Sequence, residues 1–216
     1  MISHHPSPDL LADSARGVLD PGAALVVAAH VHACSVCRAE TELWESVGGA
    51  LLQEEVPVPL SPDALQRALA RLNGNEAEPA RKRALPRYLE AFSLPAPLQA
   101  QKIGGRFWVT PNIWFAPVGM QSASDTRTYL VYAKPGTKLS LHTHAGQEFT
   151  SVLYGAFRDE SGVYGKGDFA ETDGSVLHSP TVTEESDCLC LISADAPMRL
   201  SNPIARAIQT LTGSFY

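Results

Sequence analysis

Two short stretches of this 216-residue chain concentrate the side chains that bind transition metals. The first, AHVHACSVC, places His30, Cys34 and Cys37 at positions i, i+4 and i+7. On a continuous helix, at about 100° per residue, these positions share one face, whereas His32 points the opposite way. Thiolate and imidazole together suit Zn²⁺, which takes four tetrahedral ligands in structural sites. A zinc site on this helix therefore needs a fourth ligand from elsewhere.

The residues alone leave that fourth ligand open, because His4 and His5 both lie just before the first helical stretch. Two other interpretations of the cysteine pair also stay open. Cys34 and Cys37 could be small buried hydrophobic residues in a core. A C-x-x-C pair can also be a redox dithiol, although the βαβ pattern of thioredoxin-type proteins does not surround it. The histidine four residues before the pair favours the metal site.

The second stretch, GTKLSLHTHAGQEFTSVLYG, carries His142, His144 and Glu148. Alternate residues of a strand share a face, so the two histidines are expected to point into the same interior. Glu148 follows a turn and can return from the neighbouring strand, and His178 supplies a third imidazole downstream. Three imidazoles and a carboxylate suit Zn²⁺, Fe²⁺, Mn²⁺ or Ni²⁺. The alternative is a pair of histidines on a solvent-facing strand.

A further pair, Cys188 and Cys190 in DCLCLIS, lies on one face of an expected strand. Two small residues filling a core are favoured over a reactive dithiol. A disulfide between strand positions i and i+2 would be strained.

The elements that must position these residues are expected to be helices in the first part of the chain and strands in the second. Helical periodicity covers residues 8–19, 20–55 and 61–72, with the second stretch broken near Ser35. Asp20 is the expected N-cap of that second stretch, followed by proline at the first turn. The VPVP run that follows must interrupt any helix.

The last helical stretch carries Leu65, Leu69 and Leu72 at helical spacing, which predicts one apolar stripe. Residues 73–86 are polar and charged, contain Gly and Pro, and are predicted to form a linker. Short β-rich runs punctuated by Gly and Pro follow, which indicates an all-β sandwich or barrel. These runs are RFWVT, NIWFAPV, TRTYLVYA, EFTSVLYGAF and DCLCLIS.

Composition narrows the class of protein. Hydrophobic residues make up 44% of the chain and charged residues 19%, as in an ordinary globular protein. No apolar run has the ~18–20 residues that span a bilayer, and the start lacks the order of a secretory signal, so we expect a cytoplasmic protein. The net charge is −6, with RKR as the one tight basic cluster, which argues against direct nucleic-acid binding. Binding of a basic protein partner stays open.

The second metal-binding stretch resembles the first conserved motif of the cupin superfamily. That motif is Gly, five residues, H-x-H, three residues, Glu, six residues, Gly, and it is matched at Gly136, His142, His144, Glu148 and Gly155. The second cupin motif matches at Gly167 and His178, whereas Asp173, Ser175 and Val182 replace its usual Pro, Gly and Asn. The resemblance implies a cupin barrel of six to eight strands over roughly residues 95–200.

The helical half resembles the zinc-binding anti-sigma domain, whose motif is H-x3-C-x2-C preceded by a distant histidine. His30, Cys34 and Cys37 match the compact part, and His5 matches the distant residue. An anti-sigma domain followed by a cupin resembles the ChrR family of transcriptional regulators. The expected fold class is therefore two domains, an all-α anti-sigma domain over residues 1–85 and an all-β cupin domain over 87–216.

This resemblance implies a non-enzymatic function. The helical domain would bind Zn²⁺ and sequester a sigma factor of the extracytoplasmic-function type. The cupin domain would bind a second divalent metal, Zn²⁺ first or else Fe, Mn or Ni, and would be needed for an oxidative signal such as singlet oxygen. The alternatives are a cupin metalloenzyme of the dioxygenase kind and a small-molecule sensor that acts on another partner. No membrane contact is implied, and the oligomeric state is left open.

Overall fold

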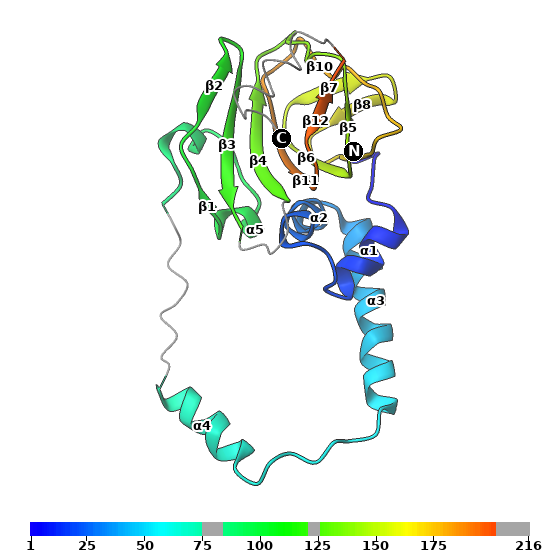
Figure 1. The fold of residues 1–216 in the computed structure, drawn as a ribbon, viewed down its shortest axis with the longest axis vertical. Helices are drawn as coiled ribbons and strands as arrows, with labels where there is room; N and C mark the ends of the chain where they lie inside the picture. Colours follow the sequence, from blue (N-terminus) through cyan, green and yellow to red (C-terminus); the bar gives the residue numbers. More distant parts are fainter. Residues whose placement is uncertain (75–83, 121–125, 202–216) are drawn as a thin grey trace.

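The structure is a computed structural model that describes residues 1–74, 84–120 and 126–201. Helices dominate the first part of the chain and strands the second (Figure 1). This order confirms the expected fold class, a helical domain followed by an all-β domain. The helical elements are α1 (Pro8–Ala15), α2 (Pro21–Ala33), α3 (Ser35–Glu54), α4 (Ala64–Gly74), η1 (Arg87–Leu89) and α5 (Ala96–Gln99).

Local signals set the helix boundaries. Ser7 caps α1 by accepting a hydrogen bond from the Leu10 amide, and Asp20 caps α2 by accepting one from the Gly22 amide at 2.9 Å. The VPVP run separates α3 from α4, as expected. Helix α4 begins at Ala64, slightly later than the sequence predicted, because Pro62 lies in a turn before it.

The strands confirm the β-rich runs, although the described residues contain more of them than the expected six to eight. They are β1 (Lys102–Ile103), β2 (Phe107–Thr110), β3 (Ile113–Gly119), β4 (Arg127–Ala133), β5 (His142–His144), β6 (Glu148–Tyr154), β7 (Ala156–Asp159), β8 (Gly162–Gly165), β9 (Phe169–Thr172), β10 (Thr181–Val182), β11 (Cys188–Ala194) and β12 (Met198–Leu200). Every pair between them is antiparallel.

Two facing layers of strands form the barrel. One is a sheet in the order β1-β3-β4-β11-β6-β9, with β2 paired to β3. The other contains β10-β7-β8 and β12-β5, which isolated bridges join at Lys138↔Thr181 and His142↔His178. Gly155, at φ +68°, allows the tight bend between β6 and β7, where a Cβ would collide with the Asp187 carbonyl.

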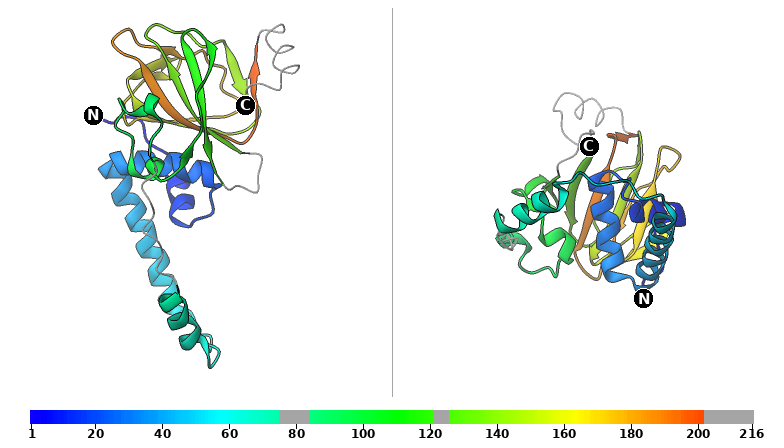
Figure 2. Two further views of the ribbon diagram at one scale, coloured as in Figure 1. Left: turned by 90° about the vertical axis from the view of Figure 1, so that its left-hand side faces the viewer. Right: turned by 90° about the horizontal axis from the view of Figure 1, so that it is seen from below.

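Helix α2 lies across the outer face of the large sheet and contacts β4, β6 and β11 (Figure 2). Val26 and Val27 on α2 are fully buried and belong to one hydrophobic core with Leu189 and Leu191 of β11. Cys188 and Cys190 of the same strand point to the other side, into the barrel interior. The helical and β parts therefore share a core on the outer face of the barrel.

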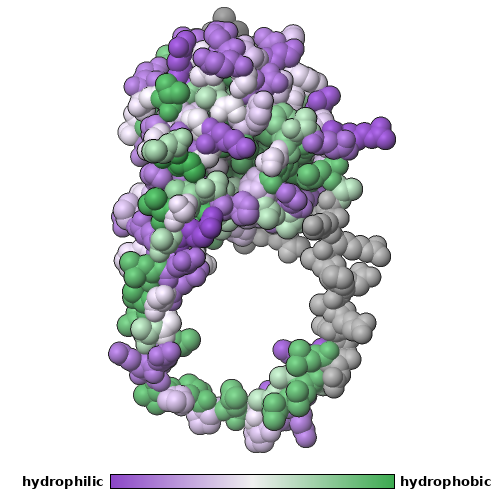
Figure 3. All heavy atoms as spheres, turned by 180° about the vertical axis from the view of Figure 1, so that it is seen from behind, coloured by the Kyte–Doolittle hydropathy of each residue, from purple (hydrophilic) through white to green (hydrophobic). Residues whose placement is uncertain are grey.

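Helices α3 and α4 project away from this body (Figures 1 and 2). We call residues 42–74 the arm. Apolar side chains line it, and they include Trp44, Leu51, Leu65, Leu69 and Leu72, whose exposed fractions run from 41% to 72% (Figure 3). The predicted apolar stripe of α4 thus faces solvent.

Most of the predicted linker, 73–86, lies outside the described residues, so the domain boundary at 85/87 stays a prediction. Among the described helices, no single one is both long and apolar enough to cross a membrane. The pair α2 and α3 passes that test only when the two are joined, and they are bent by 119° at their break.

Candidate metal centres

Four ligand side chains of the helical half meet where the N-terminal segment approaches α2 and α3. His5, His30, Cys34 and Cys37 each offer one ligand atom, and these atoms all lie within 4.8 Å of one another. The Nδ1 atom of His5 is 3.4 Å from the Sγ atom of Cys34 and 3.3 Å from that of Cys37. The Nε2 atom of His30 is 3.3 Å from the Cys37 Sγ atom. This group can hold a metal ion.

These distances match the donor set of a tetrahedral zinc site. Bond lengths of about 2.3 Å to sulfur and 2.0–2.1 Å to nitrogen place N and S ligand atoms about 3.5 Å apart. Without a metal, burial followed by the neighbouring Cys34 raises the pKa of the Cys37 thiol to about 12. A nearby cation would favour the Cys37 thiolate that a metal site requires.

The predicted break near Ser35 is present, so the expectation that His30, Cys34 and Cys37 share one face of a helix is wrong. Helix α2 ends at Ala33 and α3 begins at Ser35, so Cys34 sits at the break with an extended backbone (φ −103°, ψ 111°). The ligands converge because the chain bends by 119° there, which brings Cys37 back toward His30. His32 is exposed, as expected.

The barrel orients His30. Its Nδ1 atom lies 2.7 Å from the Gly167 carbonyl oxygen, which accepts the Nδ1 proton and leaves the Nε2 lone pair for the ligand group. Burial lowers the pKa of His30, which favours the neutral imidazole that a metal requires.

The structure distinguishes the two N-terminal histidines. His5 reaches both cysteines, whereas the His4 ring lies against Tyr164, with ring centres 4.3 Å apart, and its Nδ1 atom is 3.5 Å from an Asp168 carboxylate oxygen. His5, the histidine that the family resemblance indicated, is therefore the one in the ligand group, and His4 lies outside it.

The second group lies inside the barrel, where His142 and His144 come from β5 and His178 precedes β10. All three are buried, and their ligand atoms also lie within 4.8 Å of one another. The Nε2 atom of His178 is 3.1 Å from that of His142 and 3.2 Å from that of His144. Two tetrahedral nitrogen ligands of one metal ion would be about 3.3 Å apart. This group too can hold a metal ion.

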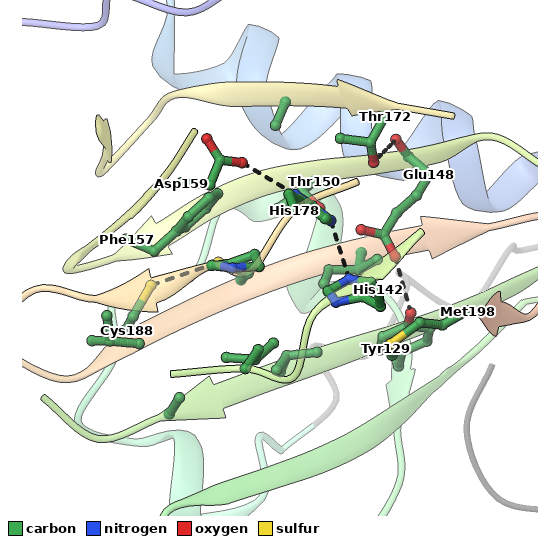
Figure 4. Close-up of a pocket in the computed structure, with 18 of the residues that line it drawn as sticks. Tyr129, His142, Glu148, Thr150, Phe157, Asp159, Thr172, His178, Cys188 and Met198 are labelled. Carbon is green, nitrogen blue, oxygen red and sulfur yellow. Dashed lines mark hydrogen bonds and ion pairs between the residues drawn. The ribbon is translucent and has the colours of Figure 1, made fainter. Parts of the chain in front are cut away.

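Hydrogen bonds on the far side of two rings aim the lone pairs inward. The Nδ1 atom of His142 is 2.7 Å from the Ser140 carbonyl oxygen, and that of His178 is 3.1 Å from Asp159 Oδ2 (Figure 4). Both acceptors take a proton from Nδ1, so the facing Nε2 atoms carry lone pairs that would repel without a cation. Burial lowers the pKa of His142 and of His144 to about 4, which keeps both rings neutral.

Glu148 lies beside this group but is not among its three close ligand residues. Its Oε2 atom is 3.5 Å from the Nδ1 atom of His144, which finds no hydrogen-bond partner among the described residues, and 3.5 Å from the Tyr129 hydroxyl. Burial raises the pKa of Glu148 to about 7. Its role as a fourth ligand stays a prediction.

A cavity of about 80 Å³ opens beside the histidines. Apolar side chains such as Phe157 and Val182 make up most of its wall, and Cys188 and Cys190 line it too (Figure 4). Their Sγ atoms are 3.7 Å apart, and the two cysteines do not form a disulfide. The cysteines therefore face the cavity from the barrel core.

Sequence reasoning missed Asp159 and Tyr129, and it missed the contact of Gly167 with His30. Asp159 belongs to GAFRDE, which follows the first cupin motif, but nothing local marks it as the partner of a histidine nineteen residues later. Gly167 has a motif position, yet its contact with His30 depends on the docking of α2.

The chain is similar to known proteins over nearly its full length. The family described as "ChrR Cupin-like domain" matches residues 107–196. The anti-sigma-E factor ChrR of Cereibacter sphaeroides is 35% identical over 213 residues, which cover 96% of this chain and 97% of that protein.

One solved structure agrees over most of the chain. The crystal structure of Rhodobacter sphaeroides SigE in complex with the anti-sigma ChrR matches with a TM-score of 0.73 and 31% identity, covering 90% of this chain and all of that chain. An RmlC-like cupin protein of Ralstonia eutropha is 12% identical with a TM-score of 0.42, over 53% of this chain and 81% of that one. On its full-length similarity, this chain belongs to the ChrR family of anti-sigma factors.

Proposed function

We propose that this chain is an anti-sigma factor that sequesters a sigma factor of the extracytoplasmic-function type and releases it on an oxidative signal, such as singlet oxygen. The relationship to the anti-sigma-E factor ChrR carries this proposal, since it spans both domains. It also supports a regulatory role over an enzymatic one. A partner of this kind would place the chain in the cytoplasm.

The arm is the proposed binding surface for the sigma factor. Leu65 and Leu69 of α4 are 70% and 49% exposed, and apolar residues of α3 such as Leu51 and Leu52 are exposed as well. Large contiguous apolar surfaces on a folded protein indicate an interaction site. An amphipathic helix that offers its apolar face to a partner is a common recognition mode.

We propose Zn²⁺ for the group of His5, His30, Cys34 and Cys37. Two thiolates and two imidazoles at these separations support zinc, which supplies folding free energy to small domains when bound. For His142, His144 and His178, with Glu148 as the fourth residue, we propose a divalent metal, Zn²⁺ first or else Fe, Mn or Ni.

The barrel is the proposed sensor. The cavity beside His142 and His178 gives a small oxidant access to the buried group, and a change there would alter the barrel or the linker at 73–86 and so release the sigma factor. Oxidation of Cys34 or Cys37, with loss of zinc from the helical domain, is the second route.

Polar substitution of the arm tests the binding proposal. Leu65→Asp with Leu69→Asp should weaken binding to the sigma factor at least ~100-fold, because each buried leucine contributes about 1.5–3 kcal/mol. Calorimetric titration with the purified sigma factor measures this. The control is Val163→Asp, a similarly exposed residue on β8. Wild-type affinity in a folded double variant would refute the role of the arm.

Alanine substitutions in the barrel test the sensor. His142→Ala or His178→Ala should leave sigma inhibition intact and abolish induction in a reporter strain exposed to singlet oxygen. Full induction by these variants would exclude the barrel route and leave oxidation of the cysteines as the alternative.

A further inference from the structure

The N-terminal strap, residues 2–7, carries His5 but owes its position to the barrel. Asp168, in the turn between β8 and β9, accepts hydrogen bonds from the backbone amides of Ser3 at 2.7 Å and His4 at 3.0 Å. The Phe169 amide in turn donates to the His4 carbonyl oxygen at 3.1 Å. His5 therefore follows directly on a backbone segment that is pinned to the barrel.

Two further contacts fix the strap on either side. The Ile2 side chain covers Gly167, where an added Cβ would lie 2.8 Å from the Ile2 Cδ1 atom. At the other end, Glu171 accepts hydrogen bonds from the Ser7 amide at 2.5 Å and the Ser7 hydroxyl at 3.2 Å. Since the Gly167 carbonyl also holds His30, residues 167–171 position two of the four ligand residues.

Strand β9 presents its two faces to the two metal groups. Phe169 lies against His30, with ring centres 5.6 Å apart, and Glu171 holds the strap. The alternate residues Ala170 and Thr172 line the barrel cavity. Thr172 pairs with Glu148 in the β6–β9 ladder, and its hydroxyl lies 3.5 Å from the Glu148 carbonyl oxygen.

We propose that Asp168 is a positioning residue that holds His5 in the helical metal site, and that strand β9 makes this hold depend on the state of the barrel site. A change at the barrel site that shifts β9, through Ala170 and Thr172 on its cavity face, weakens the hydrogen bonds from the strap to Asp168. The helical site then loses His5, the one member of the four-residue group that comes from the N-terminal strap, whereas the other three come from α2, α3 and the break between them. The inference rests on the metal sites proposed above.

The first experiment measures metal loss from the helical site of the full chain. Co²⁺ is the probe, because its thiolate charge-transfer absorption reports ligation by Cys34 and Cys37. Asp168→Asn should speed the loss of this band to excess EDTA about tenfold, as removal of a residue that orients a ligand commonly does. Asp173→Asn is the matched control, since Asp173 accepts its hydrogen bonds from Ser175 in its own turn, and should leave the rate unchanged.

A second variant guards against a folding defect in the barrel. Ile2→Ala alters only the strap, and it should also accelerate cobalt loss while the circular dichroism spectrum stays that of the wild type. Unchanged rates in both Asp168→Asn and Ile2→Ala would overturn the positioning role. If the wild-type chain itself gave no thiolate absorption, the proposed metal site of the helical domain would be wrong, and the role of Asp168 would fail with it.

A double-mutant cycle tests the link to the barrel. Glu148→Gln should speed cobalt loss from the helical site about fivefold, a typical coupling between two sites, and this effect should vanish in the Asp168→Asn background. A merely structural role of Asp168 would instead give two effects that multiply within about a factor of two. That multiplicative result would overturn the proposed coupling.

Discussion

At the scale of single residues, three histidines of the two candidate sites have their second ring nitrogen held by an oxygen acceptor. His30, His142 and His178 each place one ring nitrogen against a carbonyl or carboxylate oxygen and turn the other inward. Such partners set the tautomer and raise the basicity of a ligand. The arrangement leaves converging nitrogen and sulfur atoms that can hold a metal ion together.

Cys37 is predicted to be essential for the helical site. Cys37→Ser should remove the metal ion of that site, because serine is a poor zinc ligand, and should lower the melting temperature since zinc binding contributes folding free energy. Elemental analysis and thermal melts measure both effects. His32→Ala, in the same stretch but exposed and outside the ligand group, should retain wild-type metal content; equal metal content in the two variants would contradict the assignment.

The pH dependence of metal binding tests Glu148 as a ligand. Burial raises its pKa to about 7, so below pH 7 the carboxyl holds a proton that a metal must displace. The ratio of wild-type to Glu148→Gln affinity for Mn²⁺, which prefers oxygen and nitrogen ligands to thiolates, should fall about tenfold per pH unit below pH 7. Calorimetric titration from pH 8 to pH 5.5 measures the ratio, and a constant ratio would remove Glu148 from the ligand set.

At the scale of elements, α2 joins the two halves of the molecule. Its valines pack on the large sheet, and its N-terminus sits close to β4 and β11 at Gly22. A Cβ at Gly22 would collide with Thr128 Oγ1 and lie 2.7 Å from Ser193 Oγ. The missing side chain at this position is what lets the helix lie close to the sheet.

Gly22→Val is therefore expected to destabilise the protein by about 1–3 kcal/mol, the usual cost of overpacking. Gly48→Val in α3 is the matched control, because nothing lies within 4 Å of a Cβ there and valine has a slightly better helix propensity than glycine. Urea unfolding measures both variants. Equal stability would mean that α2 does not rest on the sheet as described.

At the scale of the whole molecule, the shared core predicts cooperative unfolding of the helical and β parts. Leu11, Val26 and Leu98 belong to one cluster with Leu130 and Leu189 of the barrel. The cobalt–thiolate absorption of the helical site and the near-ultraviolet dichroism of the barrel should therefore be lost at one temperature. Two separated midpoints would show that the domains unfold independently.

Sequence by itself determined most of the helices and strands and indicated the candidate ligand residues that the structure brings together. Apolar periodicity and proline positions located the helices, and alternation placed His142 and His144 on one face of a strand. These features depend on neighbours within a few residues. The spacing of the second cupin motif indicated His178, and the resemblance to the zinc-binding anti-sigma domain indicated His5.

Only the tertiary structure decided how the parts meet. The contact of Gly167 with His30 joins residues 137 positions apart, and the hydrogen bond from Ser3 to Asp168 joins residues 165 positions apart. The 119° bend at Cys34 changes the direction of α3 relative to α2. No local pattern encodes such contacts, because they arise when apolar faces from distant segments are buried together on the sheet. That burial places the ligand group of His5, His30, Cys34 and Cys37 next to the barrel, which contains the group of His142, His144 and His178.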